Sequence, residues 1–412
     1  MQSSKCDRLD PGIRHQVFAI ARNALAGILV VATIQASAQI AFEAQTPMPT
    51  GPTPYAIAVG DFNADGKLDL AVAMLGNNRV YIYSGNGLGA FSFAISYVVG
   101  NEPVAIVAAD LNHDGKLDLA VANHGGSAVS ILLGNGNATF SAAVAYAVGP
   151  SPYRLAAGSF DPDGFVDLVT ANNGNVCTPP FASCGSLSLL RNNGDGTFVA
   201  GAMASLSPGD VPTGIASGVL TTGGDTDLVF TGSGSNEYSV YLGDGGGGFA
   251  VHGPFATASA DAIVIADFNK DGKNDLAISR VNDGDISLQY GNGDGSFQAA
   301  AIYSAGAVGA YPDSAVVTDL DGDSFPDLAL ANYNDNSVAV MRTRTVGNLG
   351  FDAALTVTGG LDHPSSIAEG DFNGDGRPDL VVTNAGSGTL SILINTSVSN
   401  DRIFGNGFEM VL

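Results

Sequence analysis

One nine-residue stretch recurs along the chain and constrains its fold more than any other feature. Its first copy, Asp61–Asp69 (DFNADGKLD), has oxygen-bearing side chains at positions one, three, five and nine and glycine at position six. Ca²⁺ binds six to eight oxygens at about 2.3–2.6 Å, and the glycine permits the sharp turn that brings these side chains together. Position twelve, where an EF-hand carries Glu, is Val72. The stretch therefore predicts a metal loop that closes a β-hairpin.

Seven copies of this hairpin are present, and they differ in how many ligands they retain. Those at 61–69, 110–118, 267–275 and 371–379 are complete, with position seven expected to bind through its backbone carbonyl. The copy at 319–327 has Ser324 in place of the glycine, the copy at 159–167 begins with Ser159, and the copy at 219–227 has lost nearly every ligand. We expect no ion at 219–227. The predicted metal ligands are Asp61, Asn63, Asp65, Lys67, Asp69, Asp110, Asn112, Asp114, Lys116, Asp118, Asp161, Asp163, Asp167, Asp267, Asn269, Asp271, Lys273, Asp275, Asp319, Asp321, Asp323, Phe325, Asp327, Asp371, Asn373, Asp375, Arg377 and Asp379.

We expect about four to six structural Ca²⁺ ions. The alternative for any one loop is that Asp and Asn only cap a turn by accepting backbone N–H groups. Mg²⁺ is disfavoured because it retains its waters, and Zn²⁺ because the ligand positions of the loops lack its preferred sulfur and nitrogen ligands.

The spacing of the hairpins predicts the architecture. Their first positions are 61, 110, 159, 219, 267, 319 and 371, mostly 48 to 52 residues apart. A period near fifty, built from short apolar strands and Gly-rich turns, is typical of a β-propeller. We expect an all-β fold of seven four-stranded blades over residues 39–395. The last unit lacks its fourth strand, so residues 40–48 are predicted to supply it and close the ring.

The net charge of −24 excludes one class of partner. Without a basic stripe to neutralise phosphates, nucleic acid is not an expected ligand. Half of the acids beyond residue 38 belong to the six ligand-bearing hairpins, so the acidity reflects cation sites. Packed carboxylates repel one another, and the fold is expected to depend on its metals.

Residues 1–38 have the pattern of a secretory signal. Basic residues precede a short apolar run and a small-x-small cleavage site, Ala36-Ser-Ala38. About eleven apolar residues are too few to span a bilayer, so we expect no membrane anchor. The mature protein is expected to be secreted, in the periplasm, at the cell surface or outside the cell. Cys177 and Cys184 then form a disulfide or, alternatively, remain free thiols. Residues 396–412 form a tail of undecided role.

The repeated units resemble FG-GAP/VCBS repeats, the family that includes the seven-bladed propeller of integrin α subunits. The resemblance rests on the complete Asp-x-Asn-x-Asp-Gly-x-x-Asp hairpins and on Gly-rich turns ending in Phe at 91, 140, 198, 249 and 297, across roughly residues 40–395. It implies that calcium is structural and that partners bind the opposite face. The recurring Phe is expected to pack between blades.

The sequence predicts no catalytic residue and no organic cofactor. Its histidines fall at different offsets in different units, and no nucleophile elbow or phosphate loop is present. The residues that end the second strand of each unit either start turns or form a polar ring on the face away from the hairpins: Met74, Asn123, Asn172, Gly232, Arg280, Asn332 and Asn384. The side chains there best suited to hold a sugar or peptide are His124, Tyr153, Arg154, Arg280, Tyr311 and Tyr333.

The sequence is compatible with three functions. The first is a monomeric binding or adhesion module for a protein or glycan partner, the second a propeller lectin, and the third a propeller-based lyase or hydrolase. The lack of Trp and of cleanly repeated Tyr positions counts against the lectin. The short connections between blades count against the enzyme.

Overall fold

The computed structural model describes residues 40–174, 185–201, 211–232, 236–344 and 349–397. Within these ranges the chain forms β-strands and one 3-10 turn, His124–Gly126. No helix among the described residues is long and apolar enough to cross a membrane. The predicted signal segment, the Cys177–Cys184 pair and the tail beyond residue 397 lie outside the described residues.

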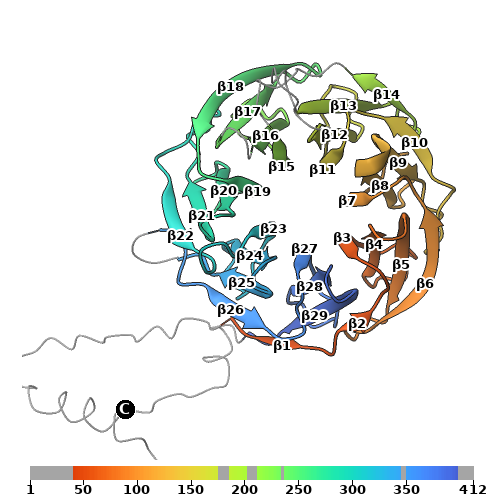
Figure 1. Ribbon diagram of the computed structural model, residues 1–412. Helices are drawn as coiled ribbons and strands as arrows, with labels where there is room; N and C mark the ends of the chain where they lie inside the picture. The colour runs from red at the N-terminus through yellow and green to blue at the C-terminus, as the bar shows by residue number, and fades with distance from the viewer. Residues whose placement is uncertain (1–39, 175–184, 202–210, 233–235, 345–348, 398–412) are drawn as a thin grey trace, which may run out of the picture. The chain divides into compact units, whose positions relative to one another are not determined.

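Seven antiparallel sheets surround a common axis, which confirms the predicted propeller (Figure 1). The inner strands are β3 (Pro54–Gly60), β7 (Pro103–Ala109), β11 (Pro152–Gly158), β15 (Pro212–Gly218), β19 (Ala260–Ala266), β23 (Pro312–Thr318) and β27 (Pro364–Gly370). The second strands are β4 (Asp69–Met74), β8 (Asp118–Asn123), β12 (Asp167–Asn172), β16 (Asp227–Gly232), β20 (Asp275–Arg280), β24 (Asp327–Asn332) and β28 (Asp379–Asn384). We number the blades one to seven in this order.

The outer half of each blade completes the sheet. The third strands are β5 (Arg79–Gly85), β9 (Ala128–Leu132), β13 (Ser186–Asn192), β17 (Glu237–Gly243), β21 (Asp285–Gln289), β25 (Ser337–Met341) and β29 (Thr389–Asn395). The outer strands of blades one to six are β6 (Phe91–Val98), β10 (Val144–Ala147), β14 (Phe198–Gly201), β18 (Phe249–Ala256), β22 (Ala301–Ser304) and β26 (Leu355–Thr358).

The N-terminal segment closes the ring, as predicted. Strand β1 (Phe42–Ala44) pairs antiparallel with β29, Phe42 opposite Asn395, and β2 (Met48–Pro49) pairs further along the same strand. The Ala41 carbonyl also accepts the N–H of Thr396 at 2.8 Å. Blade seven is therefore built from both ends of the propeller, which leaves no long unpaired edge on β29.

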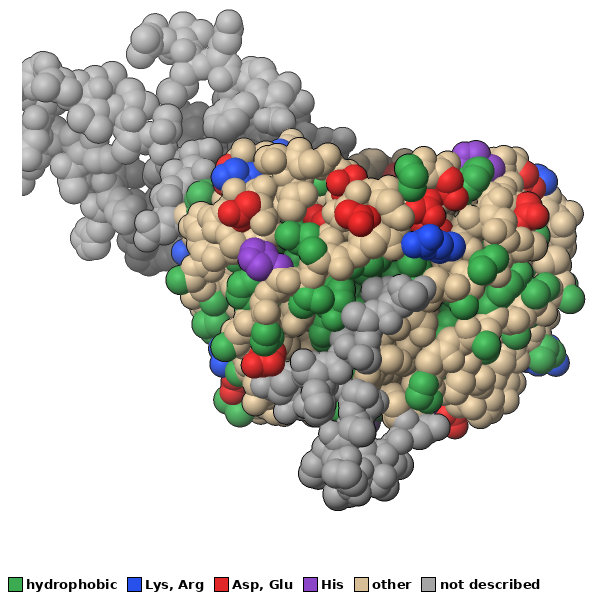
Figure 2. Space-filling model, turned by 90° about the horizontal axis from the view of Figure 1, so that it is seen from above, with side chains coloured by type: hydrophobic (Ala, Val, Ile, Leu, Met, Phe, Trp, Pro, Cys, Tyr) green, Lys and Arg blue, Asp and Glu red, His purple; other side chains and the backbone are tan. Residues whose placement is uncertain are grey.

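Burial explains why the second strands read as continuous apolar runs. Strand β4 (DLAVAM) is buried at every residue, because each blade packs its two faces against neighbouring blades. Edge-on, acidic side chains gather mainly toward one rim, while hydrophobic side chains are scattered over the outer strands (Figure 2).

Aromatic contacts join successive blades and confirm the expected role of the recurring Phe. Phe140 at the turn of blade two lies 5.6 Å, between ring centroids, from Phe62 at position two of the blade-one hairpin. The same contact joins Phe351 to Phe268 at 5.3 Å. Where position two is Leu, as at Leu111, the Phe of the next blade packs on it in the same core cluster. Hairpins and turns thus interlock around the ring.

Candidate metal hairpins and the axial cluster

Backbone N–H groups orient the oxygens of each complete hairpin. In blade one, Asp61 accepts the N–H of Asp65 at Oδ1 (3.2 Å) and that of Gly66 at Oδ2 (2.9 Å). Asn63 also accepts the Asp65 N–H, and Asp65 accepts that of Lys67 at 2.9 Å. The same four bonds recur at 110–118, 267–275 and 371–379. Gly66 has φ 79°, the left-handed conformation that favours glycine.

The aspartate at position nine has a structural role that the sequence analysis missed. Asp69 is fully buried, accepting the N–H of Phe62 at Oδ2 (3.1 Å) and that of Gly85 at Oδ1 (2.9 Å). It thereby ties its hairpin to the end of the third strand. Equivalent bonds occur at all seven positions, including Asp227 in the hairpin that has lost its other ligands. The sequence does carry a signal for this role, because Asp227 is retained in a hairpin that has lost its other ligands.

Burial raises the pKa of every position-nine aspartate, and the neighbouring acids in the hairpins raise it further. The pKa reaches about 6 for Asp167 and Asp275 and about 8 for Asp327. Desolvation disfavours the charged carboxylate at these places. A bound cation would favour the ionised form.

The four complete hairpins have the donor types that a hard cation binds, although among the described residues only the blade-six hairpin brings three carboxylate oxygens within 4.8 Å of one another. Each offers three carboxylates, one amide oxygen and a backbone carbonyl, the donor set that Ca²⁺ takes. A carboxylate has about four lone-pair sites, so an oxygen that accepts an N–H can also bind a metal. The side chain at position seven folds back onto position five: Lys116 Nζ lies 2.9 Å from Asp114 Oδ2, and Arg377 Nη2 2.9 Å from Asp375 Oδ2.

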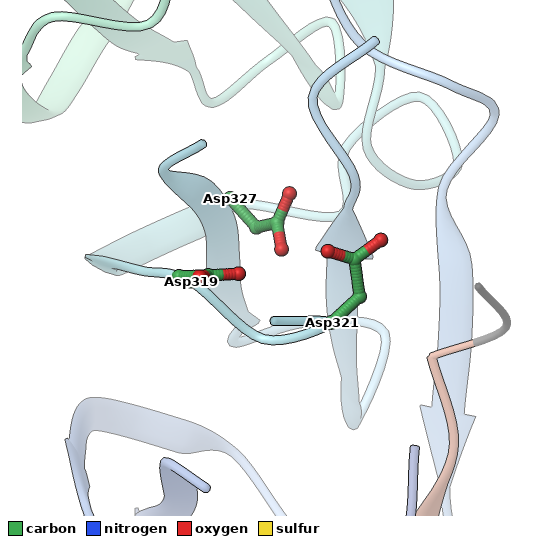
Figure 3. A group of neighbouring side chains, drawn as sticks. All are labelled: Asp319, Asp321 and Asp327. Carbon is green, nitrogen blue, oxygen red and sulfur yellow. The ribbon is translucent and has the colours of Figure 1, made fainter. Parts of the chain in front are cut away.

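The blade-six hairpin is assembled differently. Oxygens of Asp319, Asp321 and Asp327 lie within 4.8 Å of one another and face a common space (Figure 3). Ser324, at the glycine position, has φ 70°, a strained conformation for a residue with a side chain. The guanidinium of Arg342 contacts Asp321, with 2.9 Å between Nε and Oδ2.

In the blade-three hairpin, Asp161 and Asp163 form consecutive turns. Asp161 accepts the N–H of Asp163 at 3.2 Å, and Asp163 accepts that of Phe165 at 2.9 Å. Ser159 donates its hydroxyl to the Asp161 carbonyl at 3.3 Å, so it takes part in the turn that the missing carboxylate would have shaped.

A second group of polar residues lies at the other end of the inner strands. Each inner strand has a register shift near its start, at the end away from the hairpin. The residues at this shift form a ring around the axis: Tyr55, Val104, Tyr153, Thr213, Asp261, Asp313 and Ser365. A β-bulge re-aims a side chain, and here it occurs in every blade.

Arg154 joins three blades across the axis. Its Nη2 lies 2.7 Å from Asp313 Oδ1 of blade six and 3.4 Å from Asp261 Oδ1 of blade five. Its guanidinium carbon lies 4.3 Å from the centroid of the Tyr153 ring, and the Tyr153 and Tyr55 hydroxyls are 3.0 Å apart. We call these five residues the axial cluster.

The carboxylates of the axial cluster are buried, whereas Arg154 keeps some exposure. Asp261 and Asp313 are 1% and 3% exposed, and the Arg154 side chain 17%. Burial raises the pKa of Asp261 well above its usual range; Arg154 opposes the shift and Asp313 adds to it. Burial likewise raises the pKa of Tyr55 to about 12.

Aromatic side chains surround the axial cluster on the same face. The ring centroids of His124 and Tyr153 are 6.3 Å apart, those of Tyr311 and Tyr333 6.5 Å, and those of Tyr333 and His363 4.9 Å. We call His124, Tyr311, Tyr333 and His363 the rim residues. Of the side chains predicted to be suited to hold a ligand, His124, Tyr311 and Tyr333 thus lie beside one another or beside the axial cluster.

The other sequence candidates on this face have structural roles. Arg280 pairs with Asp283 and Asp285 of its own turn. The asparagines that end strand two are fully buried; Asn123, for example, donates to the Ala128 carbonyl and the Ser130 hydroxyl. These asparagines therefore stabilise the turns that follow strand two, which was the first alternative, and do not form a polar ring on this face. Three residues of the axial cluster were not predicted from the sequence: Tyr55, Asp261 and Asp313. The sequence signal for this cluster is the Pro-Tyr or Pro-Asp pair that begins β3, β11 and β23.

Solved structures share the fold at low sequence identity. The chain resembles BBS1N crystallised in complex with ARL6DN (TM-score 0.58, 15% identity, 86% of this chain and 96% of that chain). It also resembles virginiamycin B lyase from Staphylococcus aureus (0.56, 12%, 86% and 99%) and the periplasmic gluconolactonase PpgL from Pseudomonas aeruginosa (0.51, 16%, 74% and 86%). No curated relative matches the chain by sequence.

The repeats themselves identify the family. The family model described as "FG-GAP-like repeat" matches residues 61–121, 110–170, 223–278, 267–330 and 319–382, which together make up more than half of the chain. Each match begins at or within one hairpin and extends into the second strand of the next blade. This seven-bladed propeller therefore belongs to the FG-GAP-like repeat family.

Proposed function

We propose that this protein is an exported, calcium-stabilised propeller that binds a protein or glycan partner through the face opposite its hairpins and catalyses no reaction. The observation that carries the proposal is the division of polar chemistry between the two ends of the inner strands. Oxygen-rich hairpins occupy one end, and the axial cluster with its rim residues occupies the other.

The hairpin end has the chemistry of structural ions. Its ligands come from short, tightly turned loops that also interlock neighbouring blades, so an ion bound there would stabilise the ring. The position-nine carboxylates are buried, and a divalent cation would compensate their charge.

The axial end has the chemistry of a recognition surface. Tyr and His present large contact area at low conformational cost, and Tyr is enriched in binding interfaces. Arg154 is held rigid by two buried carboxylates, which suits the fixed geometry of a binding site. A propeller of the same fold, BBS1N, was crystallised with a protein partner, which makes a macromolecular partner the first expectation.

A lectin and an enzyme are the two alternatives. A cavity of 570 Å³ between the outer parts of blades five and six, lined by Tyr303, Arg344 and Asp352 among others, favours glycan as the second candidate ligand. Two neighbours in fold are a lyase and a lactonase. Against catalysis, Asp261 and Asp313 are too buried to reach a substrate and are already bound by Arg154.

The experiment is a binding screen against immobilised glycans and matrix proteins, with calcium and with chelator. Once a ligand is found, His124→Ala is compared with His113→Ala. Both histidines lie beside an aromatic ring, His124 near Tyr153 on the axial face and His113 near Phe165 on a hairpin. We expect His124→Ala to weaken binding at least several-fold and His113→Ala to leave it unchanged. The reverse pattern would place the partner on the hairpin face.

A further inference from the structure

The blade-six hairpin has one carboxylate more than the complete hairpins. Position three is Asp321, where the complete hairpins have Asn63, Asn112, Asn269 and Asn373. Asp321 is 3% exposed, and its oxygen lies within 4.8 Å of oxygens from Asp319 and Asp327. Three carboxylates so close together, with Asp323 also acting on Asp321, repel one another and require positive charge.

Arg342 supplies positive charge directly. It follows β25, and the next residue, Thr343, donates its N–H to Asp327 at 2.8 Å, which fixes the chain beside the hairpin. The Nε of Arg342 lies 2.9 Å from Asp321 Oδ2, and its Nη1 lies 3.9 Å from Asp352 Oδ2. The Arg342 side chain is 18% exposed and that of Asp321 is fully buried, so solvent screens their attraction little.

The other blades show that this arginine accompanies an aspartate at position three. The residue equivalent to Arg342, directly before the residue that donates to the position-nine aspartate, is Ser84, Leu133, Arg191, Leu242, Tyr290 or Ile394 in the other six blades. Position three is an aspartate only in blades three and six, Asp161 and Asp321. Blades three and six are also the two blades with arginine at the position equivalent to Arg342. In blade three this arginine, Arg191, donates to the Gly247 carbonyl at 2.8 Å. The pairing of residue types is therefore repeated within the chain.

We propose that the guanidinium of Arg342 is the resident cation of the blade-six hairpin, and that this hairpin binds no calcium. The inference rests on the proposed calcium sites of the complete hairpins. A divalent ion among Asp319, Asp321 and Asp327 would lie close to the guanidinium and be repelled by it. The Nε of Arg342 lies 2.9 Å from an Asp321 oxygen that the ion would need, as an ion-pair contact and not as an aligned hydrogen bond. The metal ligands predicted for this hairpin then bind no ion, and the positive charge beside them is that of Arg342: Asp319, Asp321, Asp323, Phe325 and Asp327.

The test counts bound calcium by native mass spectrometry in the full chain. We expect Arg342→Gln to bind one ion more than the wild type, because the hairpin regains its free carboxylates. Arg344→Gln is the matched control: Arg344 pairs with Asp352 at 2.9 Å and is 40% exposed, so the ion count should not change. An unchanged count in folded Arg342→Gln overturns the proposal.

Two further measurements decide the matter if Arg342→Gln does not fold. Asp319→Asn should leave the wild-type ion count unchanged, and the loss of one ion would overturn the proposal. In chelator, Asp321→Asn should restore most of the Tm that Arg342→Gln loses, whereas independent, additive effects would overturn it. A wild type that binds no calcium refutes the proposed ions of the complete hairpins, and this cycle in chelator still tests Arg342 separately.

Discussion

The Nη2 of Arg154 lies 2.7 Å from the Oδ1 of Asp313, and the two residues belong to blades three and six. Successive blades of a propeller contact one another by packing, but this ion pair joins blades that are not neighbours. Asp261 of blade five shares the same nitrogen at 3.4 Å. The axial cluster therefore braces the ring from inside while presenting part of Arg154 to solvent.

Removing the arginine should cost much of the protein's stability. Arg154→Met leaves Asp313 buried without its partner, and breaking a buried pair costs about 3–5 kcal/mol. Arg344→Met is the matched control, since the side chains of Arg344 and Asp352 are 40% and 44% exposed and such pairs contribute about 1 kcal/mol or less. Denaturant unfolding measures both. Adding Asp313→Asn to Arg154→Met should recover part of the lost free energy of unfolding. Equal losses in Arg154→Met and in the control variant would contradict a stabilising role of the axial cluster.

The position-nine aspartates should contribute to stability without any ion. Asp227→Asn removes one of two acceptors for the buried N–H groups of Leu220 and Gly243, a loss of about 1–3 kcal/mol. We expect the same loss in calcium and in chelator. Asp69→Asn should show this loss and an additional one that appears only with calcium. Thermal melts in the two buffers separate these contributions; a calcium-dependent loss in Asp227→Asn would show that its hairpin binds an ion.

Most of the fold could be predicted because each unit carries its own local signals. The hairpin at Asp61–Asp69 and the Phe of the following turn recur in phase, and that phase indicated both the number of blades and the closing strand.

The axial cluster could not be predicted because its contacts join residues that are remote in sequence. Tyr55 and Tyr153 are 98 residues apart, and Arg154 and Asp313 are 159 apart. Only the bulge at the start of each inner strand brings them together, and a bulge depends on the pairing register. The role of position nine was missed for a related reason: a hairpin aspartate has the same sequence pattern whether its oxygens bind a metal or two N–H groups.

Deleting residues 40–49 should open the ring. The deletion removes β1 and β2, exposes the edge of β29, and removes Phe42 from the cluster that contains Leu320. An exposed strand edge promotes association with other chains. We expect a lower Tm and concentration-dependent aggregation, followed by light scattering. Phe42→Ala, which keeps the backbone pairing, should lower the Tm with little aggregation. A deletion variant that remains monomeric with an unchanged Tm would exclude this closure as a source of stability.

The sign of the pH dependence should differ between the calcium-free and calcium-bound protein. The raised pKa values, about 6 for Asp167 and Asp275 and about 8 for Asp327, lie above the unfolded value of about 3.9. The calcium-free native state then binds more protons than the unfolded state, so these groups stabilise it as pH falls from 8 toward 5. Calcium requires ionised ligands, so in saturating calcium acidification displaces the ion of the complete hairpin that contains Asp275 and lowers stability. Tm between pH 5 and 6 should therefore change in opposite directions in chelator and in calcium. Asp327→Asn should flatten both curves between pH 6 and 8, because its hairpin is proposed to bind no calcium, and parallel curves of this variant below pH 6 would refute the role of calcium.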